Sequence, residues 1–354
     1  MILMTIDHAS GALNAGRLFA DGALMYKPGT ALPADQFFTR WITHLCAPSF
    51  VFLAGAALAL SVEKQLAAGG DARKIDGFIL RRGLLIASLD LVWMSWAFLK
   101  PGLFLLQVLY AIGMGLVCMI ALRRLPTRWL LGVGFGLVAG SEALAGLVVR
   151  ASGGKPGLVA GLLLTGGRFD WGFVAYPLVP WLAMMVLGWS FGRWLRGGPE
   201  RPERHLAVGG AGALAVFGIV RGLDAYGNWA LHREGGSVVQ WLHVSKYPPS
   251  ISYTALELGI GALCLAALFV VQRRPGGAPV WTAPLLVLGQ TALFFYVLHV
   301  HLLKLAAAVL GLEHRGGLRE TYLGALGALL VLYPLCVLYR RYKQAHPHGW
   351  TRYL

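Results

Sequence analysis

The sequence predicts an all-α integral membrane protein, a polytopic bundle of about nine to ten transmembrane helices in a single domain spanning residues 1–354. Hydrophobic residues make up 57% of the chain and charged residues only 13%, whereas soluble domains contain roughly 45 to 50% apolar and about 25% charged residues. In addition, apolar stretches recur along the whole chain. A helix of about 20 residues, rising about 1.5 Å per residue, crosses about 30 Å of hydrocarbon.

Nine such stretches are long enough to cross a membrane. They lie at 46–62, 78–97, 103–122, 129–149, 173–192, 206–223, 252–271, 284–305 and 321–339. The run Met1–Ile6 is apolar but too short to span. We therefore expect Asp7 and His8 to lie where a short hydrophobic helix gives way to a loop outside the cytoplasm.

The orientation follows from the basic residues. Short connections that alternate along the chain carry dense Lys and Arg, as in the pairs Arg81–Arg82, Arg123–Arg124 and Arg340–Arg341. Short cytoplasmic loops are enriched in these residues. Both termini are therefore expected in the cytoplasm, with Lys246 and Arg168 outside and Arg201 inside.

The net charge of +15 has the same explanation. Basic clusters at the inner ends of helices contact anionic lipid, so the bilayer is the expected partner. No basic stripe or stacking motif accompanies the charge, so nucleic acid is not an expected partner. Four cysteines are scattered singly, no metal-ligand spacing is present, and no metal is expected.

Several titratable residues fall within or beside the apolar stretches. With this topology, all of them are expected in the outer half of the bilayer: Asp90, Glu142, Glu257, His44 and His299. Ionisable groups at membrane depth are rare and usually face the bundle interior or a wet cavity. The sequence therefore predicts a polar chamber open to the exterior.

The histidines are the candidates for proton transfer, because imidazole titrates near physiological pH. His44 precedes a descending helix, and His299 lies in an aromatic run. His301 is about 200° from His299 on a helix, so at most one of the two points inward. Asp7 and His8 form an acid–base pair in sequence. For each histidine, a structural hydrogen bond to a nearby carbonyl is the alternative.

A second candidate is the stretch Ser245–Ser250, which reads Ser-Lys-Tyr-Pro-Pro-Ser. Its two prolines prevent a helix and favour an extended segment. Lys246 and Tyr247 would then lie at the outer mouth, just before the helix that carries Glu257. This pattern suits binding of a polar substrate, although a proline-based helix start is the alternative.

Together, five runs resemble the bacterial membrane proteins of the domain of unknown function 1624 group, which is similar to the catalytic domain of heparan-alpha-glucosaminide N-acetyltransferase. The runs are Met1–His8, Phe38–Gly55, Tyr176–Trp181, Lys246–Ser250 and Phe294–His299. The resemblance implies transfer of an acetyl group from cytoplasmic acetyl-CoA to an amino sugar across the cytoplasmic (inner) membrane of a bacterium. A homodimer is compatible with it.

The resemblance also bears on the histidines. The animal enzyme has Asn at the end of its first span, where this chain has Asp7, and a catalytic His in the following loop. That His would fall near Pro33 or Ala34 here, so the chain departs from the pattern and His8 and His44 are the nearest substitutes. Tyr296–His299 matches a His of the animal enzyme.

Two functions are compatible with the sequence. The first is an acyltransferase that moves an acetyl or other acyl group from cytoplasmic acyl-CoA to an extracytoplasmic sugar or glycan. His44 or His8 would act as base or acyl carrier with Asp7 orienting it and His299 nearby. The acceptor would be held by Lys246, Tyr247, Glu257, Arg40, Asp90 and Glu142, and the pyrophosphate of acetyl-CoA by Arg81, Arg82, Arg123 and Arg124. The alternative is a proton-coupled transporter or exporter of a polar metabolite.

Overall fold

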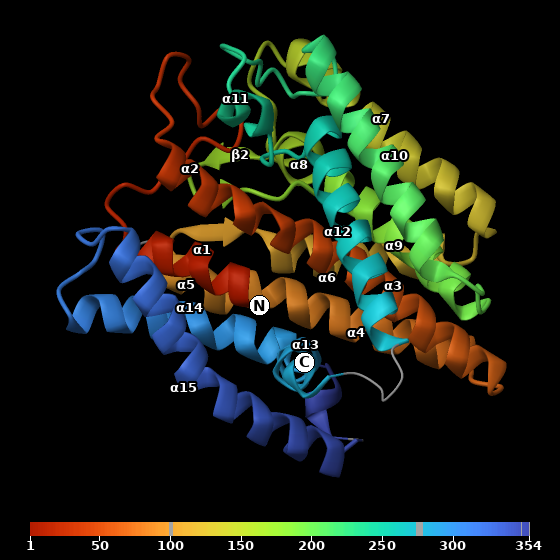
Figure 1. Cartoon of the computed structure of the whole chain (residues 1–354). Helices are drawn as coiled ribbons and strands as arrows, with labels where there is room; N and C mark the ends of the chain where they lie inside the picture. Colours follow the sequence, from red (N-terminus) through yellow and green to blue (C-terminus); the bar gives the residue numbers. More distant parts are fainter. Residues whose placement is uncertain (99–101, 274–278, 348, 354) are drawn as a thin grey trace. The chain divides into compact units, whose positions relative to one another are not determined.

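The computed structural model describes residues 1–98, 102–273, 279–347 and 349–353, and most of its regular structure is helical (Figure 1). Seven helices, counted over these residues, are long and apolar enough to cross a membrane. The prediction of a polytopic helical membrane protein is therefore confirmed. The chain divides into two compact units: unit 1 comprises 1–19, 30–46 and 270–354, and unit 2 comprises 20–29 and 47–269.

Unit 1 joins the two ends of the sequence. Its elements are α1 (Ile2–Leu13), α2 (Ala34–Trp41), η1 (Ile42–Leu45), η4 (Val280–Thr282), α13 (Ala283–Gln290), α14 (Ala292–Val309), α15 (Leu318–Ala345) and η5 (Trp350–Tyr353). Helix α1, red in Figure 1, packs against the blue helices α14 and α15. Small residues make this packing close, because Ala9, Ala12, Ala307 and Ala325 are all nearly fully buried in one cluster.

Unit 2 contains the central part of the sequence. Its helical elements are α3 (Cys46–Ala67), α4 (Ala72–Leu89), η2 (Asp90–Met94), α5 (Ser95–Phe98), α6 (Val108–Leu122), α7 (Thr127–Ala151), α8 (Leu158–Ala160), η3 (Gly161–Thr165), α9 (Leu178–Arg196), α10 (Pro202–Leu223), α11 (Val238–Leu242) and α12 (Ile251–Gln272). Helix α6 packs against α4 and α9, and α7 packs against α9.

Helix α9 lies at the centre of unit 2, and two of its tryptophans, Trp181 and Trp189, are fully buried. It crosses α3 at backbone contact distance. A Cβ atom at Gly188 would lie 1.9 Å from the Phe52 carbonyl oxygen, and one at Gly55 would lie 2.1 Å from the Met185 carbonyl oxygen. Only glycine therefore fits at these two positions, as is common where membrane helices approach closely.

The predicted spans are largely helical, with differences in detail. Seven of the nine overlap the long apolar helices, although 173–192 begins before α9 and 284–305 is divided between α13 and α14. The stretch 78–97 is instead divided between α4, the π-helical turn η2 and α5, and 103–122 contains the 15-residue α6 after a short strand. This strand, β1 (Phe104–Leu106), pairs in parallel with β3 (Gly172–Val174), which pairs antiparallel with β2 (Gly167–Phe169).

The prediction for the first helix was wrong. Helix α1 does not end before Asp7 but continues to Leu13, so Asp7 and His8 lie within it. Two polar residues interrupt the apolar pattern, which made the helix look shorter. It continues because Ala9, Ala12 and Leu13 are buried against α14 and α15.

Candidate functional site

Two of the predicted catalytic residues, His8 of α1 and His299 of α14, are in contact within unit 1. The His8 Nδ1 and His299 Nε2 atoms are 2.6 Å apart, and the two rings are stacked with centroids 4.8 Å apart. His299 is fully buried, whereas His8 is partly exposed. The structure thus brings together two histidines that are 291 positions apart in the sequence.

The other ring nitrogen of His299 defines its protonation. His299 Nδ1 lies 2.8 Å from the Tyr296 carbonyl oxygen and 3.0 Å from the Phe295 carbonyl oxygen. Carbonyl oxygens only accept, so Nδ1 must carry the hydrogen. In the neutral ring, Nε2 is then an acceptor, and the hydrogen between the two histidines belongs to His8 Nδ1.

Asp7 lies one residue before His8 and binds two arginines. Its carboxylate accepts from Arg17 Nη2 at 2.7 Å and from Arg40 Nη1. All three side chains are at least 86% buried, since their exposed fractions are 14%, 11% and 9%. Two guanidinium groups therefore lie against the carboxylate of the residue that precedes His8.

His44 lies in η1, the 3₁₀ turn between α2 and α3, and is 3% exposed. Element η1 packs against α1, the helix that carries Asp7 and His8. The four predicted catalytic residues, together with Arg40, therefore all belong to unit 1. Their roles in the reaction remain predictions.

All the predicted acceptor-binding residues except Arg40 lie in unit 2. The Lys246 backbone N–H donates to the Asp21 carbonyl at 2.7 Å, and the Lys246 ammonium lies 5.2 Å from the centre of the Tyr247 ring. Glu257 of α12 is 2% exposed, and its Oε1 has no hydrogen-bond partner among the described residues. Lys246 and Glu257 attract each other electrostatically.

Asp90 and Glu142 each bind backbone N–H groups. Asp90 Oδ2 accepts from Gln107 N at 2.9 Å and Tyr110 N at 2.6 Å, at the start of α6. Glu142 accepts from Gly227 N and Trp229 N, both at 3.0 Å. These carboxylates stabilise the ends of elements. Asp90 and Glu142 thus bind two different segments of unit 2, and the shared chamber stays a prediction.

The arginines predicted to bind acetyl-CoA lie where α4 meets α6. Arg123 donates to Asp76 Oδ1 through two nitrogens, at 2.6 and 3.0 Å, and is 6% exposed. Arg124 binds Asp76 Oδ2 at 2.7 Å but is 62% exposed. Arg81 is also exposed. Arg123 therefore packs the helices together, while Arg81 and Arg124 are accessible to a pyrophosphate and Arg82 is half-buried.

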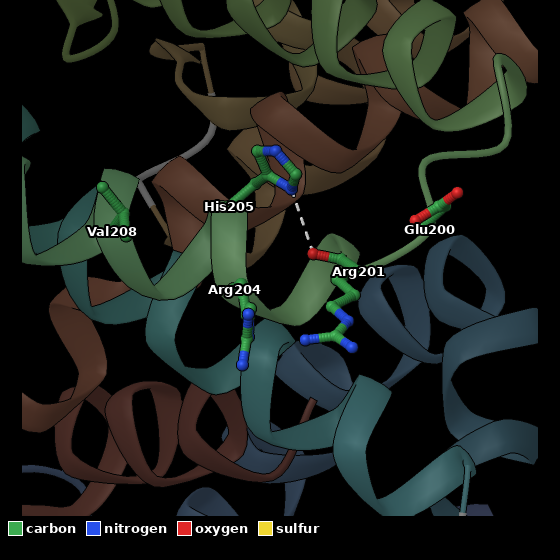
Figure 2. A pocket seen from close by; sticks show the side chains of 5 residues that line it. All are labelled: Glu200, Arg201, Arg204, His205 and Val208. Carbon is green, nitrogen blue, oxygen red and sulfur yellow. Dashed lines mark hydrogen bonds between the residues drawn. The ribbon is translucent and has the colours of Figure 1, made fainter.

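A hollow of about 440 Å³ opens at the start of α10 (Figure 2). Its lining consists of one contiguous segment, residues Glu200, Arg201, Arg204, His205 and Val208. His205 Nδ1 lies 3.0 Å from the Arg201 carbonyl oxygen. No predicted site residue lines this hollow. We give it no part in the chemistry, because it is open and lies at a basic helix start of the kind that topology alone requires.

Sequence reasoning missed two buried polar groups. Arg17 shares Asp7 with Arg40, and its position ten residues after an acid in a polar segment was the available signal. Arg221 is fully buried in α10 and donates to the carbonyl oxygens of Leu231, Gln240 and His243, each at 2.7 Å. Nothing in the local sequence indicates that this arginine organises the segment before α12.

The sequence profile of the family described as "Heparan-alpha-glucosaminide N-acetyltransferase, catalytic" matches residues 23–225, more than half of the chain. The chain belongs to this family. The predicted resemblance is thereby confirmed, and membership in the heparan-alpha-glucosaminide N-acetyltransferase catalytic family indicates a membrane acetyltransferase with acetyl-CoA as donor. A search of curated proteins finds no match.

The family match includes some candidate residues and leaves out others. Arg40, His44, Asp90, Glu142 and the four arginines fall within it. Asp7, His8, Lys246, Tyr247, Glu257 and His299 lie outside the matched range. The matched range therefore does not bear on the roles of this second group, which stay predictions.

Among the described residues, no group of three or more His, Cys, Asp or Glu side chains is placed to hold a metal ion. The expectation of a metal-independent reaction stays a prediction.

Proposed function

We propose that this protein transfers an acetyl group from acetyl-CoA, bound from the cytoplasm, to a hydroxyl or amine of a sugar or glycan on the outer face of a bacterial inner membrane. Besides family membership, the observation that supports this most is the buried His8–His299 pair beside Asp7, Arg17 and Arg40. Such a pair inside a membrane helix bundle is costly unless it serves a function.

The protonation pattern makes His8 the base. Its Nδ1 donates to His299, so the lone pair of neutral His8 is on Nε2. Because His8 is partly exposed and His299 is fully buried, only His8 can meet a substrate directly. His44 is the second candidate, since its helical turn packs against α1.

Atoms and protons balance in the proposed reaction. His8 Nε2 takes the proton from the acceptor hydroxyl or amine while the acceptor O or N forms a bond to the thioester carbonyl carbon. The C–S bond breaks, and the thiolate of CoA receives the proton from the His8 imidazolium. His299 accepts a hydrogen bond from this imidazolium throughout.

Arg17 and Arg40 provide the charge at this site. Negative charge develops on the thioester oxygen in the transition state, and fixed positive groups stabilise such an oxyanion. Asp7 holds the two guanidinium groups on the turn of α1 that carries His8. On the donor side, Arg81 and Arg124 are the exposed groups suited to the pyrophosphate.

The test is transfer of radiolabelled acetyl from acetyl-CoA to glucosamine by the purified protein in vesicles. Label should appear in the sugar when acetyl-CoA and sugar are on opposite sides of the bilayer, or when both compounds are present on both sides. No label should appear when both compounds are confined to the same side. Movement of unmodified sugar across the membrane, driven by a proton gradient and without acetyl transfer, would instead support the transporter alternative.

The sidedness has its own test. Single cysteines at positions 168 and 246 should react with a membrane-impermeant thiol reagent added outside, and one at 201 should react only after permeabilisation. Labelling of position 201 from outside would overturn the proposed orientation.

A further inference from the structure

A second set of contacts, within unit 2, joins four aromatic side chains in series. Tyr176 is stacked on Trp181 with ring centroids 4.4 Å apart and meets Tyr247 edge-on at 5.5 Å. Trp181 in turn meets Tyr253 edge-on at 6.3 Å.

A titratable residue is associated with each end of this series. Glu257 follows Tyr253 by one turn of α12, so the two share a face. On the other side, the Lys246 ammonium lies over Tyr247, and Lys246 and Glu257 attract each other. We call the six residues the aromatic ring site: Tyr176, Trp181, Lys246, Tyr247, Tyr253 and Glu257.

Two buried polar atoms of the aromatic ring site, one on Glu257 and one on Trp181, lack hydrogen-bond partners among the described residues. Glu257 is 2% exposed, and its Oε1 has no hydrogen-bond partner among the described residues; Lys246 is 3% exposed. The indole N–H of the fully buried Trp181 also has no partner among the described residues. Buried polar atoms left without partners are unfavourable, so a polar molecule that forms hydrogen bonds with them is expected.

We propose that the aromatic ring site binds a pyranose sugar, with one of its hydroxyl or amino groups donating to Glu257 and a neighbouring hydroxyl accepting from Lys246. A hydroxyl both donates and accepts, so a pair of adjacent sugar substituents can satisfy both charges with strong charge-assisted bonds. The Trp181 N–H would donate to a further sugar oxygen.

Two features of the site favour a sugar over a simple ion or water. The first is charge, because an ion of either sign would bind only one of Lys246 and Glu257. The second is the set of aromatic side chains. Binding sites for small molecules combine apolar and aromatic walls with a few convergent polar groups, and the apolar C–H face of a pyranose fits such a wall. The site deepens the proposed function, because it would hold the acceptor sugar.

The test is binding without any acyl donor. Saturation-transfer NMR on the detergent-solubilised full-length protein would use glucosamine as probe. A parallel measurement with glucose would show how much the amino group of the sugar contributes to binding. Glu257→Gln and Lys246→Met should each weaken glucosamine binding roughly 10- to 100-fold, since each removes a charged hydrogen-bond partner. Trp181→Phe keeps an aromatic side chain but removes the indole N–H, and it should weaken glucosamine binding by a smaller factor.

Matched controls are the same substitutions at exposed positions, Lys155→Met and Glu313→Gln. Both should bind glucosamine as the unmodified protein does. All variants are checked by size-exclusion chromatography and thermal melting. Replacing both charges together, Lys246→Met with Glu257→Leu, should keep or raise the melting temperature while binding is lost, because removal of a buried charge pair is often neutral or stabilising.

The outcomes separate this site from the proposed reaction. Unchanged binding in Glu257→Gln and Lys246→Met, or no saturable binding at all, would show a pair solvated by water only and overturn the site. If these variants transferred acetyl with an unchanged KM for the sugar, the site would fail while the proposed function stood. Loss of transfer by the unmodified protein with binding intact would overturn the proposed function alone.

Discussion

Two sets of buried polar side chains, one in each unit, have different kinds of partner. In unit 1, titratable groups contact each other: His8 meets His299, and Asp7 meets Arg17 and Arg40. In unit 2, Asp90 and Glu142 bind backbone N–H groups, and Arg221 binds backbone carbonyls. Side chains bonded to the backbone hold elements together, whereas pairs of titratable side chains can exchange protons. The His8–His299 contact is the reason why we propose the proton chemistry in unit 1.

The largest expected effect is on transfer. His8→Ala should lower the rate of acetyl transfer by about 100- to 10,000-fold, because removal of a general base usually has this cost. His44→Ala is the matched comparison within the same unit. If His44→Ala lost transfer to this extent while His8→Ala stayed within a few-fold of the unmodified protein, the base would be His44, as the sequence first suggested.

Substitution of His299 should have the second largest effect on the rate of acetyl transfer. His299→Leu removes the acceptor for His8 Nδ1–H, and we expect transfer to fall roughly 10- to 100-fold, the value of one hydrogen bond to a charged group. His299→Gln offers an amide oxygen in a similar place and should recover much of the rate. The pH profile of the rate distinguishes positioning from packing, since only loss of the acceptor makes His8 a weaker base and moves its midpoint to lower pH.

A substitution of Asp90 tests whether the carboxylates of unit 2 that bind backbone N–H groups stabilise the fold. Asp90→Ala should lower the free energy of unfolding by about 1 to 3 kcal/mol, because Gln107 N and Tyr110 N lose their acceptor. Asp90→Asn keeps one acceptor oxygen and should lose less. Thermal melting in detergent measures both. Equal melting temperatures for all three proteins would contradict the structural role.

The smallest expected effect concerns His243, which lies between α11 and α12 outside the spans. Burial lowers the pKa of His243 from its ordinary value of 6.5, and its Nε2 lies 2.7 Å from the Ala20 carbonyl oxygen. The unfolded chain therefore binds a proton more readily than the folded one. This contribution to stability is full above about pH 6.5 and is lost as the pH falls through the lowered pKa.

His243→Gln removes this dependence, since glutamine can still donate to Ala20 without titrating. Melting temperatures at pH 7.5 and 5 should differ less for the variant than for the unmodified protein. The same pH dependence in both proteins would rule out His243 as the source.

The class of fold follows from the sequence alone. Long apolar stretches have to be helices in a bilayer, because the hydrocarbon offers no partners for backbone N–H and C=O groups. Sequence also pointed to His8, His299 and Asp7, since ionisable residues within apolar runs are rare. It could not show that α1 continues to Leu13, because the polar pair at 7 and 8 breaks the apolar pattern.

The pairing of these residues, in contrast, depends on the tertiary structure. His8 and His299 are 291 positions apart, and Arg40 reaches Asp7 across 33 positions. No local pattern encodes such contacts, because they depend on α1 packing against α14, α15 and η1. The short strands β1 to β3 escaped prediction for the same reason: each has three residues, and what makes them strands is a partner elsewhere in the chain.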